Sequence, residues 1–333
     1  MDASLTRTAA PSPVERLIRQ HRLRAYEALP WAVAIVAYFL LPDYLALGTN
    51  IMIMVLFALS LDLILGYAGI VTLGHAAFYG LGAYTAGILG ARGWSEPLSG
   101  LVAAGALAGL AGLGSGIVIL RTRGLTLLML TLAILFMLQE AANKAGFLTG
   151  GADGLQGVTI DPVLGLFRFD MFGHTAYLYC LVVVFCAWLF ARQLVHSPFG
   201  RSLTGIRENV ARMHALGAGV RRRLITVYTI AAVIAGIAGG LQAQTTQFAA
   251  LSWLSFEMSG AILIMLILGG TGRLYGAFVG APLYMIAQDV LSRIDPAYWF
   301  GWIGLFLILV VMFARGGILG LLDRGLAVLR RRA

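Results

Sequence analysis

The sequence predicts an all-α polytopic membrane protein with about ten transmembrane helices. Of its 333 residues, 59% are hydrophobic and 12% are charged, whereas soluble domains have about 45–50% apolar and about 25% charged residues. A soluble fold of this size would leave apolar surface in water, so lipid is the solvent that fits. The 42 glycines, against 9 prolines, are typical of membrane helices that pack backbone to backbone.

Ten apolar runs lie near the length of about 20 residues that crosses a bilayer. They cover residues 29–47, 50–66, 71–91, 98–120, 124–140, 176–195, 224–241, 256–269, 276–292 and 299–314. The eighth run is short, so we expect it to be tilted or broken at Gly269–Gly270. The third run contains several glycines around Gly74, which are compatible with either a continuous or a discontinuous helix.

The basic residues predict the orientation. With the N-terminus in the cytoplasm, only Arg92, Lys144, Arg168 and Arg293 lie outside, and the other twenty of the 24 lysines and arginines lie inside. This bias places both termini in the cytoplasm. It predicts basic tails at 1–28 and 315–333, a permease domain at 29–314 and a periplasmic loop at 141–175. The net charge of +9 is therefore topogenic, and membrane lipid rather than nucleic acid is the expected partner.

Small residues recur at spacing four, which places them on one helix face. Four such stripes predict tight, glycine-rich helix seams. They are Gly100, Ala104, Ala108, Gly112 and Gly116; Ala232, Gly236 and Gly240; Gly272, Gly276 and Gly280; and Gly82, Ala86 and Gly90.

Motifs for chemistry within this chain are missing from the sequence. There is no G-x-x-x-x-G-K-[ST] motif for binding ATP, and the single lysine, Lys144, lies on the outer side. The five histidines lack metalloprotease spacing. Cys180 and Cys186 lie on different faces of one helix, where they cannot pair with each other. We therefore expect no catalytic residue, no metal and no cofactor in this chain.

The loop at 196–223 is the most informative polar segment. Pro198 and Gly200 open it, and Gly217 and Gly219 close a helical pattern. Apolar residues at steps of three and four predict one short amphipathic helix over 203–217, with Arg207, Glu208 and Arg212 facing away from the apolar side. The apolar residues are Leu203, Ile206, Val210, Met213 and Leu216. Such a helix docks into a partner's groove or lies flat on lipid, and the pattern leaves both open.

The stretch at 197–217 resembles the coupling loop of bacterial branched-chain amino-acid ABC permeases of the LivM type. Blocks at 66–84, 130–133, 148–155 and 268–281 resemble the same family in the same order. The resemblance implies an inner-membrane subunit that pairs with a second, non-identical permease. Two cytoplasmic ATPases would bind ATP and magnesium, and a periplasmic amino-acid-binding protein would dock on the outer loops, including 149–157.

The resemblance also assigns candidate residues. It favours docking of the ATPases on a set of loop residues: Gly200, Arg201, Ile206, Arg207, Glu208, Asn209, Ala211, Leu216 and Gly217. Candidates for the translocation pathway are Asp62, Thr72, Gly74, His75, Gly269, Gly270 and Gly272. Asp62 lies one turn from the cytoplasmic end of its helix. We expect it either to act in a gate or to form a structural hydrogen bond. His75 is expected to be a packing residue.

The expected substrates are leucine, isoleucine and valine, with urea, short amides and other amino acids as alternatives. The chain departs from the family pattern at Asp62, where asparagine is common, and at Ile70 and Thr72, where glutamine and serine are usual. An ion-coupled secondary transporter would need intramembrane carboxylates, and Asp62 alone lies clearly inside. A structural or assembly subunit is a third hypothesis.

Overall fold

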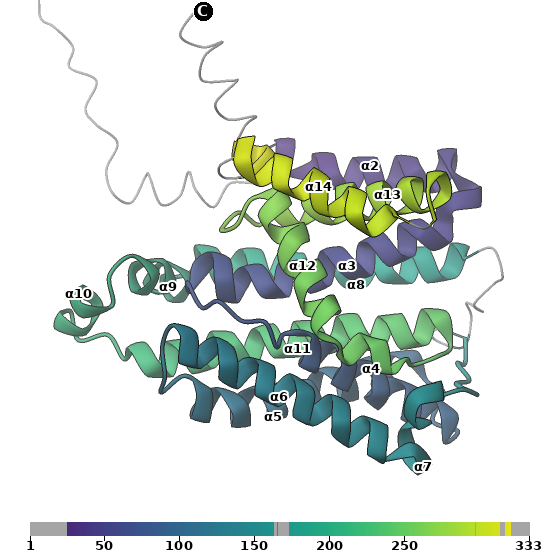
Figure 1. Cartoon of the computed structure of the whole chain (residues 1–333), viewed down its shortest axis with the longest axis horizontal. Helices are drawn as coiled ribbons and strands as arrows, with labels where there is room; N and C mark the ends of the chain where they lie inside the picture. The colour runs from purple at the N-terminus through teal and green to yellow at the C-terminus, as the bar shows by residue number, and fades with distance from the viewer. Residues whose placement is uncertain (1–24, 163–164, 166–172, 297, 314–316, 321–333) are drawn as a thin grey trace, which may run out of the picture.

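The computed structural model describes residues 25–162, 165, 173–296, 298–313 and 317–320 (Figure 1). The predicted tails fall largely outside these residues. Within them, ten helices have twelve residues or more: α2 (Leu29–Leu40), α3 (Leu45–Asp62), α4 (Ala76–Ala91), α5 (Pro97–Ile119), α6 (Leu125–Lys144), α8 (His174–His196), α11 (Val220–Thr246), α12 (Phe256–Gly269), α13 (Gly276–Ile294) and α14 (Trp299–Phe313). No β-strand occurs in the described part, where Leu155 and Ala249 form an isolated bridge.

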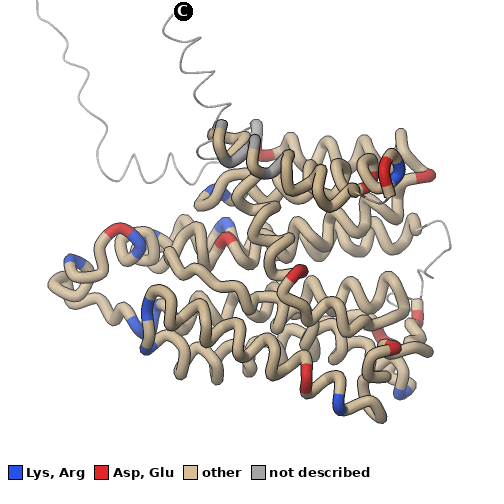
Figure 2. Tube along the Cα trace, in the orientation of Figure 1, with Lys and Arg blue, Asp and Glu red and all other residues tan. Residues whose placement is uncertain are grey.

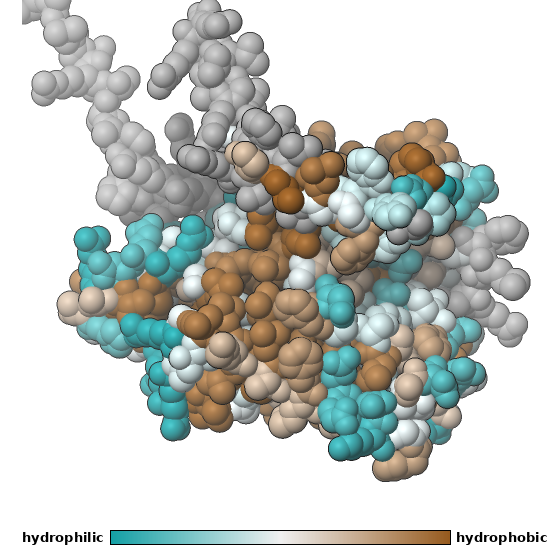
Figure 3. All heavy atoms as spheres, in the orientation of Figure 1, coloured by the Kyte–Doolittle hydropathy of each residue, from teal (hydrophilic) through white to brown (hydrophobic). Residues whose placement is uncertain are grey.

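Five segments are long and apolar enough to cross a membrane by length and composition. They are Pro42–Tyr67, which contains α3, and the helices α5, α6, α8 and α11. The helices α2 and α12 are apolar but shorter. Hydrophobic side chains cover the middle of the face seen in Figure 3, and hydrophilic ones gather toward its two ends. These findings confirm the prediction of an all-α polytopic membrane protein.

The structure gives a physical reason for where three of the predicted apolar runs end or break. The predicted end of the first run at 47 was wrong, because α2 ends at Leu40 and α3 already begins at Leu45. Pro42 lacks an N–H and disfavours the helical conformation at Leu41, whose φ is −127°. The third run is discontinuous: residues 68–75 are not an α-helix, and α4 starts at Ala76. The eighth helix ends at Gly269, since Gly270 has φ +114°.

The centre of the bundle is α11, which packs against α5 on one side and α4 on the other. A Cβ at Gly236 would overlap that of Ala108 and lie 2.8 Å from the carbonyl oxygen of Ala104 on α5. On its other side, Gly82 of α4 meets the backbone of Gly236. Lipid supplies no hydrophobic force between helices, so this close approach stabilises the seam through van der Waals contact.

Several other predicted stripe residues lie in two seams, whereas Gly90 faces residues 158–159 and Gly272 lies outside both seams. Gly100, Gly112 and Gly116 of α5 face α11, and Gly240 of α11 faces α5. A second seam joins α12 to α13, where Gly269 abuts the backbone of Gly276, and Gly280 abuts that of Met265. Figure 1 shows α3 between the α4, α5, α6 and α11 group and the α2, α13 and α14 group.

One end of the bundle gathers arginines (Figure 2). It consists of α9 (Pro198–Glu208), α10 (Val210–Ala215) and the turn at 120–124 between α5 and α6. We call it the arginine-rich end. The opposite end carries three short helices: α7 (Gly146–Thr149), η4 (Gly151–Asp153) and η5 (Leu251–Leu254).

The prediction of one amphipathic helix over 203–217 was wrong. The structure has two helices, because Asn209 is extended (φ −157°) and its side chain accepts a 2.9 Å hydrogen bond from the Arg212 N–H, which begins α10. Leu203 and Ile206 of α9 are buried as predicted, but Leu216 is 73% exposed and does not belong to the apolar face. Gly217, with φ +74°, follows the end of α10.

Candidate functional site

The most informative polar contact lies where α3 ends. Asp62 is fully buried, and its Oδ1 accepts a 2.7 Å hydrogen bond from the Gly272 N–H in the turn between α12 and α13. Beyond Asp62 the chain widens into the π-helical turn η3 (Leu63–Tyr67). Because π turns are frequent at functional sites, this position is a candidate for a moving part.

Arg207 of α9 reaches the same place from the arginine-rich end. Its Nη1 donates a hydrogen bond to the carbonyl oxygen of Gly66, in η3. Its aliphatic stem covers Gly69, where a Cβ would lie 2.9 Å from the Arg207 Cγ. A Cβ at Gly272 would lie 2.8 Å from the Arg207 Nη1. We call Asp62, Gly66, Gly69, Arg207 and Gly272 the glycine junction.

The three glycines are what allows the junction to form. Gly69 and Gly272 have φ of +71° and +75°, a region that side chains with a Cβ rarely adopt. Gly66 leaves room for the Asp62 carboxyl and the Gly272 amide, because a Cβ there would overlap the Asp62 Oδ1. A segment of α9 is thereby held directly against the backbone of the membrane bundle.

The junction contains an incompletely satisfied acid. Among the described residues, the Asp62 Oδ2 is buried and has no hydrogen-bond partner. A buried carboxyl that accepts a single hydrogen bond is costly, and a nearby cation or a further donor would lower that cost. Arg207 is the cation of this junction, and its described hydrogen bond goes to Gly66 rather than to Asp62.

A second cluster fills the break before α4. The side chains of His75 and Ser60 are 2.8 Å apart, from Nε2 to Oγ, and the His75 ring stacks on Phe57 with 5.5 Å between centroids. Thr72 accepts a 3.2 Å hydrogen bond from the Gly74 N–H, and Gly74 abuts the carbonyl of Thr131 on α6. His75 is fully buried. In this conformation the polar groups form two local pairs, and the His75 Nδ1 is buried without a hydrogen-bond partner among the described residues.

A third polar set was not predicted from the sequence. Gln242 of α11 accepts a hydrogen bond from the Tyr79 hydroxyl (3.3 Å) and donates to Asn50 (3.2 Å). Gln244 accepts from the Tyr179 hydroxyl (3.1 Å) and donates to the Pro97 carbonyl (2.7 Å). Two amides directly after the apolar run at 224–241 are the signal that could have found this set, because buried amides need partners.

The structure thus separates the predicted pathway residues into three places. Asp62 and Gly272 join Arg207 in the glycine junction, and Thr72, Gly74 and His75 form the second cluster with Ser60. Gly269 and Gly270 lie in the α12–α13 seam.

The predicted loop residues divide by exposure. Gly200 and Ile206 are buried, and Asn209 separates α9 from α10. The remaining loop residues are exposed at the residue level: Arg201, Arg207, Glu208, Ala211, Leu216 and Gly217.

A helix bundle with glycine seams, and with a surface helix anchored to a break in one span, is the architecture of a polytopic membrane protein. The family described as "Branched-chain amino acid transport system / permease component" matches residues 44–316. The chain belongs to this family of ABC-transporter permease components.

Individual relatives agree with this membership. The chain is 26% identical over 299 residues to the high-affinity branched-chain amino acid transport system permease protein LivM of Escherichia coli K12, covering 82% of this chain and 69% of that protein. It is 27% identical over 175 residues to a probable LivM of Methanocaldococcus jannaschii, covering 51% and 47%. The autoinducer 2 import system permease protein LsrC of Enterobacter sp. strain 638 is 28% identical over 329 residues, covering 93% and 91%. No solved structure matches the chain.

Proposed function

We propose that this chain is a membrane-spanning subunit of an ABC importer in a bacterial inner membrane. It pairs with a second, homologous permease, and two cytoplasmic ATPases supply the energy by binding and hydrolysing ATP with magnesium. A periplasmic binding protein delivers the substrate to the end of the bundle that carries α7, η4 and η5. The arginine-rich end faces the cytoplasm, in agreement with the positive-inside rule.

The observation that carries the proposal is the hydrogen bond from Arg207 to the Gly66 carbonyl. It ties α9 to the end of α3, and Asp62 in turn ties α3 to the α12–α13 turn through the Gly272 N–H. A shift of α9 therefore reaches two transmembrane elements without a flexible intermediate. This is the kind of contiguous contact through which an ATPase can bias two arrangements of a bundle.

In this proposal, ATP binding in the partner ATPases moves α9 and α10 as one body. The Met213 side chain of α10 packs against Gly205 of α9, so the two helices support each other. The helices of the bundle then slide along the glycine seams, which have little side-chain interlocking. Asp62 has an unfilled acceptor at Oδ2, so an Arg207 that leaves Gly66 has a new partner within the same junction.

The proposed substrates are leucine, isoleucine and valine, which the family description and the LivM relatives support. Autoinducer 2 is a second candidate, because the LsrC relative aligns over 93% of this chain. Uptake of labelled leucine into proteoliposomes that contain the complete transporter tests the choice. We expect competition by isoleucine and valine and none by urea, acetamide or autoinducer 2. Uptake that only autoinducer 2 or an amide inhibits would contradict the assignment.

The coupling role has a separate test. Arg207 bonds into the bundle, so Arg207→Gln is expected to retain the ATPases during purification and to lose substrate-stimulated ATP hydrolysis and uptake. The matched control is Arg212→Gln, which removes the same charge from an exposed arginine on α10. Wild-type coupling in Arg207→Gln would show that this contact does not transmit the motion.

A further inference from the structure

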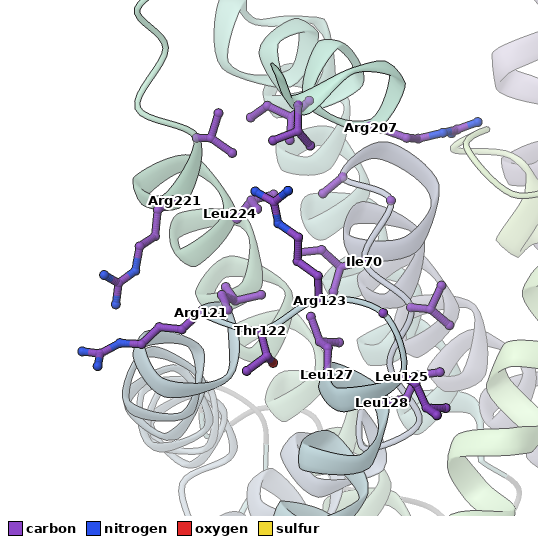
Figure 4. Close-up of a pocket in the computed structure, with 18 of the residues that line it drawn as sticks. Ile70, Arg121, Thr122, Arg123, Leu125, Leu127, Leu128, Arg207, Arg221 and Leu224 are labelled. Carbon is purple, nitrogen blue, oxygen red and sulfur yellow. The ribbon is translucent and has the colours of Figure 1, made fainter. Parts of the chain in front are cut away.

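A pocket of about 730 Å³ opens at the arginine-rich end (Figure 4). Three parts of the chain surround it: the segment at 68–71, the turn at 120–125 between α5 and α6, and the region from α9 to the start of α11. It borders the glycine junction, since Gly69 and Arg207 are also among its lining residues. In Figure 4 the Arg207 side chain points away from the pocket interior.

The pocket has an unbalanced positive charge. Arg121, Arg123, Arg207 and Arg221 line it together with His214, and none of the described lining residues is acidic. Arg221 donates to the Ile117 carbonyl (3.0 Å). The backbone N–H of Arg121 donates to the Val118 carbonyl (3.4 Å), but within the described part of the chain the side chains of Arg121 and Arg123 form no hydrogen bond or ion pair. Several like charges around one cavity repel one another, so an anion bound there would be stabilised by all of them.

The arrangement of the arginines around the pocket favours a phosphate group as the bound anion. In Figure 4, Arg123 extends into the space between Ile70 and Leu224, whereas Arg121 of the α5–α6 turn and Arg221 of α11 both extend to the left of the view, away from Arg123. Guanidinium groups bind phosphate oxygens through paired hydrogen bonds. Arginines on two separate parts of the pocket wall therefore suit the several oxygens of a phosphodiester better than a single halide ion.

The exposed apolar residues at and beside the pocket indicate which class of molecule carries the phosphate. Leu125 lines the pocket and is 68% exposed, and Val118 and Ile117 on the neighbouring face of α5 are 61% and 40% exposed. In Figure 1, α5 and α6 lie at the edge of the bundle. A ligand that occupies both surfaces has a charged head and hydrocarbon chains, which a free phosphate or an acidic protein segment lacks.

We propose that this pocket binds the headgroup of an anionic glycerophospholipid, with its phosphate on Arg121, Arg123 and Arg221 and its acyl chains along the outer face of α5 and α6. The proposal uses the orientation given above, in which this end meets the cytoplasmic leaflet, whose anionic lipids attract basic clusters. Because Ile206 and Val210 line the far wall, the bound lipid also braces α9 and α10 against the α5–α6 turn.

Native mass spectrometry of the full-length chain tests the site, with phosphatidylglycerol and phosphatidylcholine of identical acyl chains as probes. We expect wild-type protein to bind phosphatidylglycerol about tenfold more tightly. The double variant Arg121→Gln/Arg123→Gln should lose this preference. The matched control Arg212→Gln/Arg222→Gln removes the same charge from two exposed arginines outside the pocket and should retain it.

Three results would overturn the proposal. The first is equal binding of the two lipids by wild-type protein, or an unchanged preference in the folded double variant. The second is full displacement of phosphatidylglycerol by inorganic phosphate at constant ionic strength, which would indicate a simple anion site. The third is a double variant that keeps its lipid but loses the ATPase subunits during purification, which would assign the pocket to an acidic segment of the ATPase.

A measurement on wild-type protein keeps the test decisive if the double variant does not fold. Photoactivatable phosphatidylglycerol, reconstituted with the full-length chain, should label peptides that contain residues 117–128 or 221–224. Labelling confined to other parts of the chain would contradict the proposal. Failure of amino-acid uptake would affect only the proposed substrate, because neither lipid measurement depends on transport.

Discussion

The buried Asp62 carboxyl accepts a hydrogen bond from the backbone of Gly272, a residue 210 positions later in the chain. This contact fastens the end of α3 to the turn between α12 and α13. Arg207 forms a hydrogen bond with Gly66, which lies one turn beyond Asp62. Two long-range contacts, one made by a carboxyl group and one by a guanidinium, therefore lie within a few residues of each other. A change at either contact should therefore affect both the stability of the bundle and its response to the ATPases.

The first prediction separates the structural role of Asp62 from a role of its charge. Asp62→Asn keeps an acceptor for the Gly272 N–H and removes a costly buried carboxylate, so we expect equal or higher thermal stability. Asp62→Leu leaves that N–H unpaired, at a cost of about 1–3 kcal/mol. Thermal unfolding in detergent measures both, and Asp153→Asn at an exposed position is the control. Equal melting temperatures for Asn and Leu would show that the hydrogen bond contributes nothing.

The same pair of variants also decides between a gate and a purely structural contact. Asp62→Asn that folds normally and transports normally assigns Asp62 to structure, whereas normal folding with lost uptake assigns its charge to the transport cycle. Uptake of labelled substrate into proteoliposomes is the readout.

The second prediction concerns the close approach of Gly272 to Arg207. Gly272→Ala introduces a Cβ at φ +75°, 2.8 Å from the Arg207 Nη1. The left-handed backbone alone costs about 1–2 kcal/mol. Gly93→Ala is the matched control, since Gly93 has φ +89° and nothing within 4 Å of a built Cβ. We expect Gly272→Ala to lower the melting temperature clearly more than Gly93→Ala does.

A double-mutant cycle identifies the cause of that difference. Combined with Arg207→Ala, the Gly272→Ala change should lose part of its excess cost, because the Arg207 Nη1 is gone while the Gly66 carbonyl oxygen, 3.1 Å from the Cβ position, remains. Strictly additive effects of the two changes would place the penalty elsewhere in the turn.

The all-α class and the existence of helix seams could be predicted from sequence, because both depend on local composition and spacing. A run of apolar residues identifies a buried or lipid-facing helix wherever its neighbours are. Spacing of four places Gly112 and Gly116 on one face before any partner is known. The break between the first two helices was misplaced because the apolar run continues through Leu41, and the steric effect of Pro42 was not weighed.

The glycine junction could not be derived in this way, because its contacts join residues 141 and 210 positions apart. Arg207 was assigned to the polar side of an amphipathic helix, yet a long arginine side chain can bend from that side into the bundle. The break at Asn209 was also hidden, because one extended residue hardly disturbs a period of three to four. Asparagine as a favoured N-cap residue was the available signal.

The third prediction tests the α5–α11 seam with two glycines of one helix. A Cβ at Gly112 would overlap that of Ala232, whereas one at Gly114 would meet nothing within 4 Å. Gly112→Ala should destabilise the protein by about 1–3 kcal/mol through overpacking. Gly114→Ala should be neutral or stabilise by up to about 1 kcal/mol through helix propensity. The difference in unfolding temperature between the two variants is the measurement, and equal values would show that the seam tolerates separation.

The fourth prediction concerns the ion pair between Glu27 and Arg192, which joins the chain just before α2 to α8. The two groups are 3.0 Å apart, and each side chain is 11% exposed. Glu27→Gln removes one charged partner from a largely buried guanidinium, and breaking a buried pair costs up to about 3–5 kcal/mol. The residual exposure should reduce this value, and we expect a loss at or somewhat below the lower end of the range.

The chain contains a matched surface pair for comparison. Glu140 and Lys144 are 3.3 Å apart on α6, with side chains 58% and 77% exposed. Glu140→Gln should change stability by no more than about 0.5 kcal/mol, because water and salt screen exposed helix pairs. Raising the salt concentration should therefore leave the destabilisation by Glu27→Gln nearly unchanged. If both variants unfolded at the wild-type temperature, α2 would be held by its apolar contacts alone, among them those of Trp31 with Phe185 and Trp188.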